Sequence, residues 1–325
     1  MAVSVFDGAK GAKHWISRFG ASEPNSGKAY REILAKHAKF YDRLSELSAD
    51  LTPVGCCVPF VTQYELDFRP NKNNLNCAWA TKVFERMGLP FYFSNKFEGA
   101  VFLSENLIPQ MSDEQIERMF EDSSVFLDSV SAELLIERGF ERFLGVKAVP
   151  YEGKTIFGEI FEDSGNMCAR QYEMKELKVT ADGVRVLSHC YHQTQTGIER
   201  VCPAVTVLPR KNGRLTVVYC GTPDTPWNYI DAFSFLNESR KRQFVSLLKE
   251  ANSLPVYYVG DNEICLRAGV TPDGRLVAMF INLGTDPEET LTIGLEKEPK
   301  DIRILLPDGS TAKCDWKPSG EGIKL

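Results

Sequence analysis

The chain has 325 residues, of which 43% are hydrophobic and 25% charged, a balance that is ordinary for a folded chain and excludes a long disordered protein, a collagen and a coiled coil. Its formal net charge of −6 does not attract phosphate backbones or anionic lipid, so we expect no nucleic-acid partner and no membrane partner. The length is about twice a typical domain of roughly 150 residues, which predicts two or three domains.

Residues 1–51 are predicted to be a single β-α unit. Residues 10–20 are typical of a short strand, and apolar residues spaced three and four apart predict a long helix from about residue 27 to residue 51. One strand and one helix cannot bury their own apolar faces. We therefore expect this segment to be the last unit of a larger barrel, with part of its apolar stripe exposed or covered by self-association.

Strands and helices alternate between residues 52 and 252. The apolar run Val54–Phe60 is typical of a buried parallel strand, residues 76–87 predict a helix that ends before Gly88, and Ser112–Gln115 has the pattern of a capping box. The alternation continues with strands at 89–93, 100–103, 125–128 and 215–220, a helix that ends at Gly139, and a helix at 235–248. This pattern predicts an α/β fold with a doubly wound, mostly parallel sheet.

Two other regions have a strand pattern only. Residues 156–161, 172–179 and 184–191 predict a β insertion at about 150–200. The strands expected after residue 253 are 256–259, 264–268, 276–283, 290–293 and 302–306. Their short length and roughly ten-residue spacing predict a small antiparallel β-sandwich over residues 253–325, with an incomplete final strand.

The nine cysteines are scattered without a CxxC spacing, which favours a reducing compartment and a cytoplasmic location. The first residues have neither the basic segment nor the apolar core of a signal peptide. Two thiols lie beside glycines, Cys56 and Cys220, and are the alternative nucleophiles of a free-standing hydrolase, with the stretch His189–His192 supplying a base. Neither thiol directly precedes a predicted helix, and no His-x-Glu sequence follows.

Other polar and aromatic residues suggest few binding sites. His189 and His192 point to opposite faces of a strand, and no phosphate-binding glycine loop is present, so we expect no metal and no cofactor. Asp128 ends a predicted parallel strand, where α/β folds place their sites, or else caps the next helix. Trp227 lies in a loop and is a candidate for contact with a sugar, and Trp316 is a second aromatic candidate.

Several segments, taken in chain order, resemble one family. The segments are 11–18 with the helix from residue 27, 100–104, 111–115, 125–132, 137–146 and 254–287. They are similar, in turn, to the end of the (β/α)8 barrel, the amidotransferase-like domain and the small C-terminal β-domain of the β-galactosidases of glycoside hydrolase family forty-two. The resemblance implies a class I glutamine amidotransferase-like, or flavodoxin-like, sheet at 52–252.

The resemblance also implies a role. In that family the middle domain mediates trimerisation, and the two catalytic glutamates lie on barrel strands upstream of this sequence. Trp15 and Arg18 stand where the family carries a substrate-facing Trp-Arg pair, although two residues separate them here.

We therefore predict that the chain has no catalytic residue. It is expected to be the non-catalytic, assembling C-terminal part of a β-galactosidase-like glycoside hydrolase, which self-associates as a homo-oligomer, a trimer if it follows the family. Its other partners would be the barrel domain and, through the parent protein, carbohydrate. The alternatives are a free-standing amidotransferase-like hydrolase with a Cys/His site and a carbohydrate-binding module.

Overall fold

The computed structural model describes residues 1–9, 32–60, 77–225 and 233–325. The strand expected at 10–20 lies outside these ranges, and so do Trp15, Arg18 and Trp227. No helix within the described ranges is long and apolar enough to cross a membrane.

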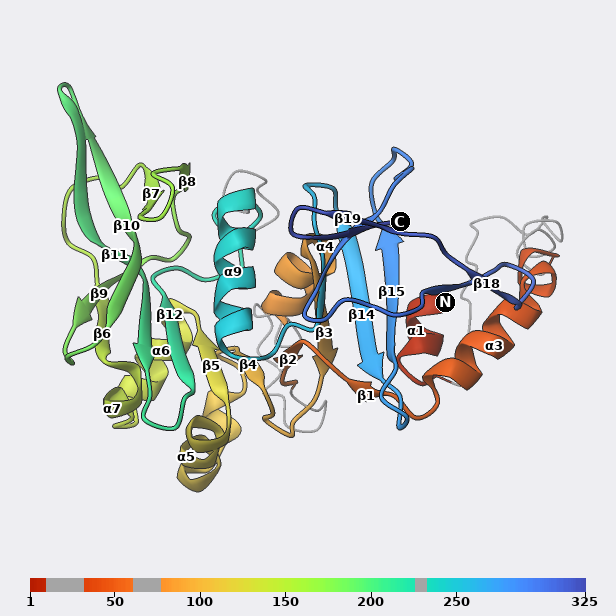
Figure 1. The fold of residues 1–325 in the computed structure, drawn as a ribbon. Helices are drawn as coiled ribbons and strands as arrows, with labels where there is room; N and C mark the ends of the chain where they lie inside the picture. The colour runs from red at the N-terminus through yellow and green to blue at the C-terminus, as the bar shows by residue number, and fades with distance from the viewer. Residues whose placement is uncertain (10–31, 61–76, 226–232) are drawn as a thin grey trace, which may run out of the picture.

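A sheet of twelve strands runs through the molecule (Figure 1). Its strands, from one edge to the other, are β1 (Thr52–Pro53), β14 (Ile264–Val270), β3 (Gly88–Phe93), β2 (Cys56–Val58), β4 (Ala100–Leu103), β5 (Ser124–Leu127), β12 (Leu215–Tyr219), β11 (Gly197–Pro209), β10 (Arg185–Thr194), β7 (Gly158–Phe161) and β8 (Met167–Ala169), with β15 (Leu276–Asn282) paired to β14. The neighbours β3, β2, β4, β5 and β12 are parallel. The predicted α/β fold with a largely parallel sheet is confirmed.

The five parallel strands follow the order 2-1-3-4-5, when they are numbered along the chain. This is one of the two common orders of doubly wound sheets, and it places a switch point between β2 and β4, where the crossover connections change sides. Ligands of such sheets bind at the carboxyl ends of the strands near that point. The strand order therefore directs the search for a site to this edge.

Helices cover both faces of the parallel strands, because successive side chains of a strand point to opposite faces. One face packs against η2 (Trp79–Phe84), α4 (Glu85–Met87) and α9 (Glu238–Glu250). The other face packs against η3 (Ile108–Gln110), α5 (Asp113–Asp122), α6 (Ser129–Glu137) and α7 (Glu141–Leu144). The arrangement gives the sheet two separate cores.

Local capping determines where several helices begin. The predicted capping box is confirmed, because Ser112 accepts from the Gln115 N–H and the Gln115 side chain accepts from the Ser112 N–H. The helix expected at 235–248 begins later, at Glu238, because the Asn237 side chain accepts from the Arg240 N–H at 2.8 Å. The expected helix at 76–87 is a π-helical turn, η2, followed by α4.

The C-terminal strands form small antiparallel sheets and also extend the main sheet. One small sheet contains β13 (Val256–Tyr258), β16 (Thr292–Leu295), β20 (Gly322–Lys324) and β19 (Lys317–Ser319), and a hairpin contains β17 (Arg303–Leu305) and β18 (Thr311–Lys313). β14 instead pairs in parallel with β3, where Leu266 faces Pro90. Leu266 and Ala268 of β14 also pack against Ile293 and Ile323 of the small sheet.

The N-terminal segment packs against the strand β15 (Figure 1). Helix α1 (Ala2–Phe6) and helix α3 (Ala38–Ser48) bury Phe6 and Leu44 against β15. Ile33, in the described part of the predicted long helix, is exposed. The segment's apolar stripe is therefore covered in part by this chain's own β15.

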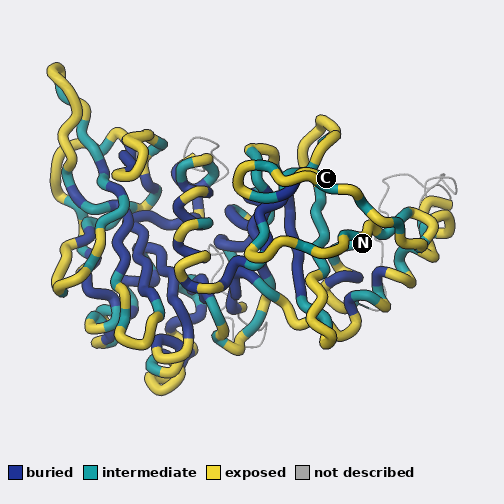
Figure 2. The backbone as a smooth tube through the Cα atoms, in the orientation of Figure 1, coloured by how far each residue is buried: buried dark blue, intermediate teal, exposed yellow. Residues whose placement is uncertain are grey.

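The β insertion contains a long hairpin. The small sheet β6 (Val146–Pro150) and β9 (Lys175–Val179) lies at its base, and β10 and β11 pair over most of their length. The strand β11 was not predicted. Its register ends in a two-residue loop at Gln195 and Thr196, and Figures 1 and 2 show this tip projecting away from the body with exposed residues.

Candidate functional site

A small acidic pocket lies at the carboxyl ends of β4, β5 and β12. Its volume is about 30 Å³, which is room for one or two water molecules. Its lining residues are Ala78, Ser104, Glu105, Asn106, Asp128, Val130, Glu173, Thr222 and Asp224. Four of them carry carboxyl groups and none carries a basic group, so the pocket favours cations and hydrogen-bond donors.

Asp128 is the buried acid of this pocket, with 4% of its surface exposed. Its Oδ1 accepts from the Ser131 N–H at 2.7 Å, which caps α6, and its Oδ2 accepts from the Thr222 hydroxyl at 3.1 Å. Burial and, to a smaller extent, the nearby Glu105 raise the pKa of Asp128, whereas the hydrogen bonds from Ser131 and Thr222 lower it, and the resulting pKa is about 6. Asp128 is therefore the N-cap of α6, and its carboxyl group also lines the pocket.

Ser129, the residue after Asp128, forms hydrogen bonds with two loops at the edge of the pocket. The Ser129 N–H donates to Gly221 O at 3.1 Å, and the Ser129 hydroxyl donates to Glu173 O at 3.2 Å. Glu173 has a φ of 46°, a left-handed conformation that is uncommon for a residue other than glycine and is often found at functional sites. The loops after β8 and β12 are thus held together at the start of α6.

Trp79 packs beside the switch point. Its side chain is fully buried, and its indole N–H donates to the carbonyl of Leu103, the last residue of β4, at 3.1 Å. The ring packs on Phe102 and Tyr219, with centroids 5.2 and 5.6 Å away. An aromatic side chain of this protein therefore covers the end of β4 on the face opposite α5 and α6.

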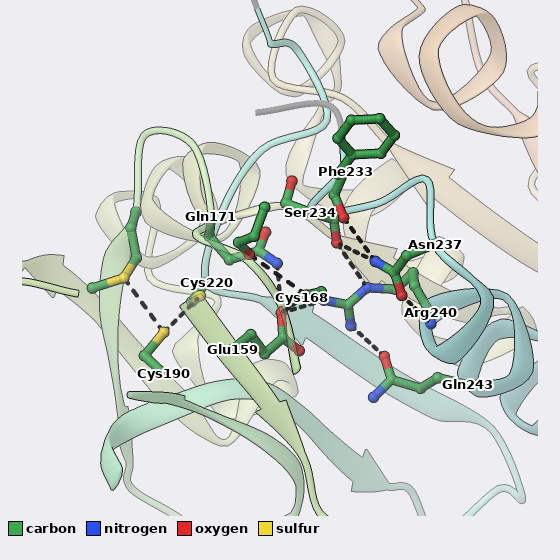
Figure 3. Close-up of polar contacts among 12 residues, drawn as sticks. Glu159, Cys168, Gln171, Cys190, Cys220, Phe233, Ser234, Asn237, Arg240 and Gln243 are labelled. Atoms are coloured by element: carbon green, nitrogen blue, oxygen red, sulfur yellow. Dashed lines mark hydrogen bonds and ion pairs between the residues drawn. The ribbon is translucent and has the colours of Figure 1, made fainter. Parts of the chain in front are cut away.

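A second polar cluster is buried between the insertion and α9 (Figure 3). Glu159 of β7 and Arg240 of α9 form an ion pair at 2.5 Å in which neither side chain is exposed. Gln171 donates to Glu159 Oε2 at 2.6 Å, and Gln243 accepts from Arg240. Phe161, Tyr219 and Phe235 surround the guanidinium at 5.1 to 5.4 Å.

The glycine-adjacent thiols lie in the interior. Cys56 is fully buried in β2, and burial raises its pKa well above the ordinary thiol value. Cys220 is also fully buried, directly after β12, with a raised pKa of the same origin and with the Cys190 Sγ 3.6 Å away. A thiol without solvent contact and with a raised pKa is a poor nucleophile, so these surroundings do not favour the role considered for either residue.

The two candidate histidines, His189 and His192, have separate partners in the described part of the chain. His189 Nδ1 lies 2.8 Å from Glu162, which also accepts from Arg200 at 2.9 Å. His192 Nδ1 lies 2.8 Å from the carbonyl of Thr155. Within the described ranges no group of three or more His, Cys, Asp or Glu residues could hold a metal ion.

Trp316 is the aromatic candidate that lies within the described residues. Trp316 is half-buried and packs against the core between β14 and the small sheet. In the sequence Glu159, Glu162 and Asp163 have the pattern of solvated surface charges, and for Glu159 this interpretation is wrong, because its side chain is fully buried. The sequence did not point to Arg240 or to the pocket as a whole. Only the position of Asp128 at a strand end was visible, because the other residues meet through loops that are far apart along the chain.

Comparisons with known proteins include a distant structural neighbour. No family model and no curated protein sequence matches the chain. An exo-beta-1,4-mannosidase from Opitutaceae bacterium strain TAV5, a solved structure, has 10% sequence identity and a TM-score of 0.36, and the match covers 66% of this chain. The chain spans 38% of the length of that mannosidase, and a likeness of this size carries no argument about activity.

Proposed function

We propose that this chain is the non-catalytic, assembling C-terminal part of a glycoside hydrolase of the β-galactosidase-like type. The sequence resemblance suggests the family, and the strand order 2-1-3-4-5 is consistent with the amidotransferase-like domain that the resemblance implies. In this proposal Trp15, Arg18 and Trp227 are carbohydrate contacts of the parent protein.

The observation that carries the proposal is the hairpin of β10 and β11, here called the arm and defined as residues 192–200. The strand β7 pairs with β10 only as far as Tyr191. Beyond that point each arm residue is half-buried or exposed. His192 and Glu199 at the start of the arm contact Thr155 and Lys154, and Figure 2 shows the tip of the arm projecting beyond the rest of the chain. A two-stranded hairpin without a third strand or a core contributes little stability alone.

The arm has the properties of an assembly element. Its base is held by Glu162, which contacts His189 of β10 and Arg200 of β11. Hydrogen bonds with Arg200 and His189 lower the pKa of Glu162, so it is ionised at neutral pH. The tip carries an exposed Ile198 and free backbone edges, which can pair with another chain. Two identical edge strands can pair with each other in an antiparallel arrangement. We therefore expect the arm to bind the arm of a second copy of this chain.

The test is sedimentation equilibrium on the full chain and on two hairpin variants, together with an assay against nitrophenyl glycosides. One variant replaces residues 193–198 with Asn-Gly, which keeps the register of His192 with Glu199 and forms a tight turn. The matched control shortens the β14–β15 turn by replacing residues 271–275 with Asn-Gly.

We expect the full chain and the control to form one defined oligomer without turnover, and the arm variant to be a folded monomer. A monomeric full chain would contradict the assembly role. Turnover that is lost in Cys56→Ala or Cys220→Ala would instead establish the hydrolase alternative.

A further inference from the structure

Three free thiols gather in the core at the base of the arm. Cys190 of β10, Cys202 of β11 and Cys220 after β12 belong to one cluster of buried side chains, with exposed fractions of 0%, 4% and 0%. Cys190 Sγ lies 3.6 Å from Cys220 Sγ, and Figure 3 shows these two side chains facing each other. The distance between the sulfur atoms alone would therefore select Cys190 and Cys220 as the partners of a disulfide.

The backbone register excludes that pair. The Cys220 N–H donates to the carbonyl of Ala204 at 2.8 Å, so Cys220 lies beside β11, on the side away from β10. The Cα atoms of Cys190 and Cys220 are thus two strand spacings apart, which is about 9–10 Å. Cysteines whose Cα atoms are more than about 7 Å apart are not bridged unless the backbone moves.

The register selects Cys190 and Cys202 instead. These two residues are directly opposite each other on the antiparallel strands β10 and β11, so their side chains lie on the same face of the sheet. The Cα atoms of such a pair are about 4.5 or about 5.5 Å apart. Both distances fall within the range of about 4.4–6.8 Å that disulfides span.

The pair also has a specific position relative to the arm. The strand β7 pairs with β10 as far as Tyr191, the residue directly after Cys190, and beyond it the arm is a two-stranded hairpin. A bond between Cys190 and Cys202 closes a ring that contains the whole arm, residues 192–200. A cross-link restricts the conformations that the enclosed residues reach when they separate, so this bond would hold the two strands of the arm together.

We infer that Cys190 and Cys202 form a disulfide when the chain folds in the presence of a low-molecular-weight disulfide such as oxidised glutathione. The thiolate of one cysteine attacks the glutathione disulfide and releases one glutathione. The thiolate of the other cysteine attacks the mixed disulfide and releases the second glutathione, and the two released thiolates take up the two protons. Two protein thiols are oxidised to one disulfide, and one glutathione disulfide is reduced to two thiols.

The reaction takes place during folding and not in the folded chain. In the folded chain, the hydrogen bond with Cys190 and burial raise the pKa of the Cys202 thiol, and Cys190 has no exposed surface. Because only thiolates attack a disulfide, both residues are then unreactive. They meet the oxidant while β10 and β11 pair and before the core covers them.

The test is refolding of the reduced, urea-unfolded full chain in a glutathione redox buffer, followed by peptide mass spectrometry without reductant. We expect linked peptides that carry Cys190 and Cys202 in the wild type and in Cys220→Ala, whereas Cys190 should stay a free thiol in Cys202→Ala. A bond between Cys190 and Cys220 would overturn the inference. So would a refolded wild-type chain in which Cys190 and Cys202 both remain free.

Hydrogen exchange of the oxidised and the reduced wild-type chain tests the effect on the arm. The amides of the arm should exchange about tenfold more slowly in the oxidised chain, whereas the amides of α5, outside the ring, should exchange at the same rate in both. Equal exchange of the arm amides in the two chains would show that the bond does not hold the arm strands together.

Discussion

The hydroxyl of Thr222 donates to the carboxylate of Asp128 at 3.1 Å, although 94 positions separate the two residues in the sequence. The contact brings the loop after β12 onto the cap of α6. It also places the buried Asp128 carboxyl group at the carboxyl edge of the sheet, where burial and the nearby Glu105 disfavour its ionised form.

The raised pKa of Asp128 makes stability depend on pH. The pKa is about 6 in the folded chain and near 3.8 ordinarily, so the folded state binds the proton more tightly. The resulting stabilisation is fully present below about pH 3.8 and is lost as the pH rises through about 6. The difference corresponds to about 3 kcal/mol. Asp128→Asn keeps a good helix cap and should remove this loss, so it should be more stable than the wild type at pH 7.5.

The measurement is the free energy of unfolding in urea at several pH values between 4 and 7.5. The exposed turn residue Asp182 supplies the control variant Asp182→Asn, which should keep the wild-type slope. Equal slopes for the wild type and Asp128→Asn would show that Asp128 does not carry the pH dependence.

Breaking the buried ion pair should be costly. Arg240→Met leaves the Glu159 carboxylate buried without its counter-charge and should lower stability by about 3–5 kcal/mol. Arg242→Ala is the matched control, because it breaks an exposed pair with Glu238 on the same helix and should cost less than about 1 kcal/mol. Chemical denaturation gives both values, and similar losses for the two variants would contradict a special cost of burial.

Gly88 and Gly139 allow a comparison of two glycines with left-handed backbones, at φ values of 68° and 84°. A Cβ at Gly88 would lie 2.5 Å from Tyr258 Cβ, whereas a Cβ at Gly139 meets nothing within 4 Å. Both alanine variants should lose about 1–2 kcal/mol from the backbone conformation, and Gly88→Ala should lose more because Tyr258 must move. Thermal unfolding of the two variants measures the difference in stability. Equal losses would mean that Tyr258, in β13, moves away from the added Cβ at no measurable cost.

The buried thiols should resist alkylation. In the folded chain at pH 8, iodoacetamide should modify the half-buried Cys77 and Cys314 before it reaches Cys56 or Cys220, because burial raises the pKa of both interior thiols and only thiolates react. Peptide mass spectrometry with and without denaturant reads the modification at each site. Rapid labelling of Cys56 or Cys220 in the folded chain would restore that residue as a candidate nucleophile.

Much of the parallel core could be predicted from the sequence, since its signals are local. The capping box at Ser112 and Gln115 depends on residues three apart, and the buried strands β2, β4 and β5 are short apolar runs of three or four residues. Hydrogen bonds within one turn of a helix, and side chains that alternate along one strand, are determined by neighbours in the chain.

Only the tertiary structure decided which distant segments meet. The pairing of β14 with β3, the ion pair between Glu159 and Arg240 across 81 positions and the contact of Asp128 with Thr222 all depend on register between separate strands and helices. A buried glutamate and a surface glutamate have the same local sequence pattern, and the free energy that separates them comes from partners supplied by the fold. The pocket and the buried cluster are therefore properties of the assembled sheet and its helices.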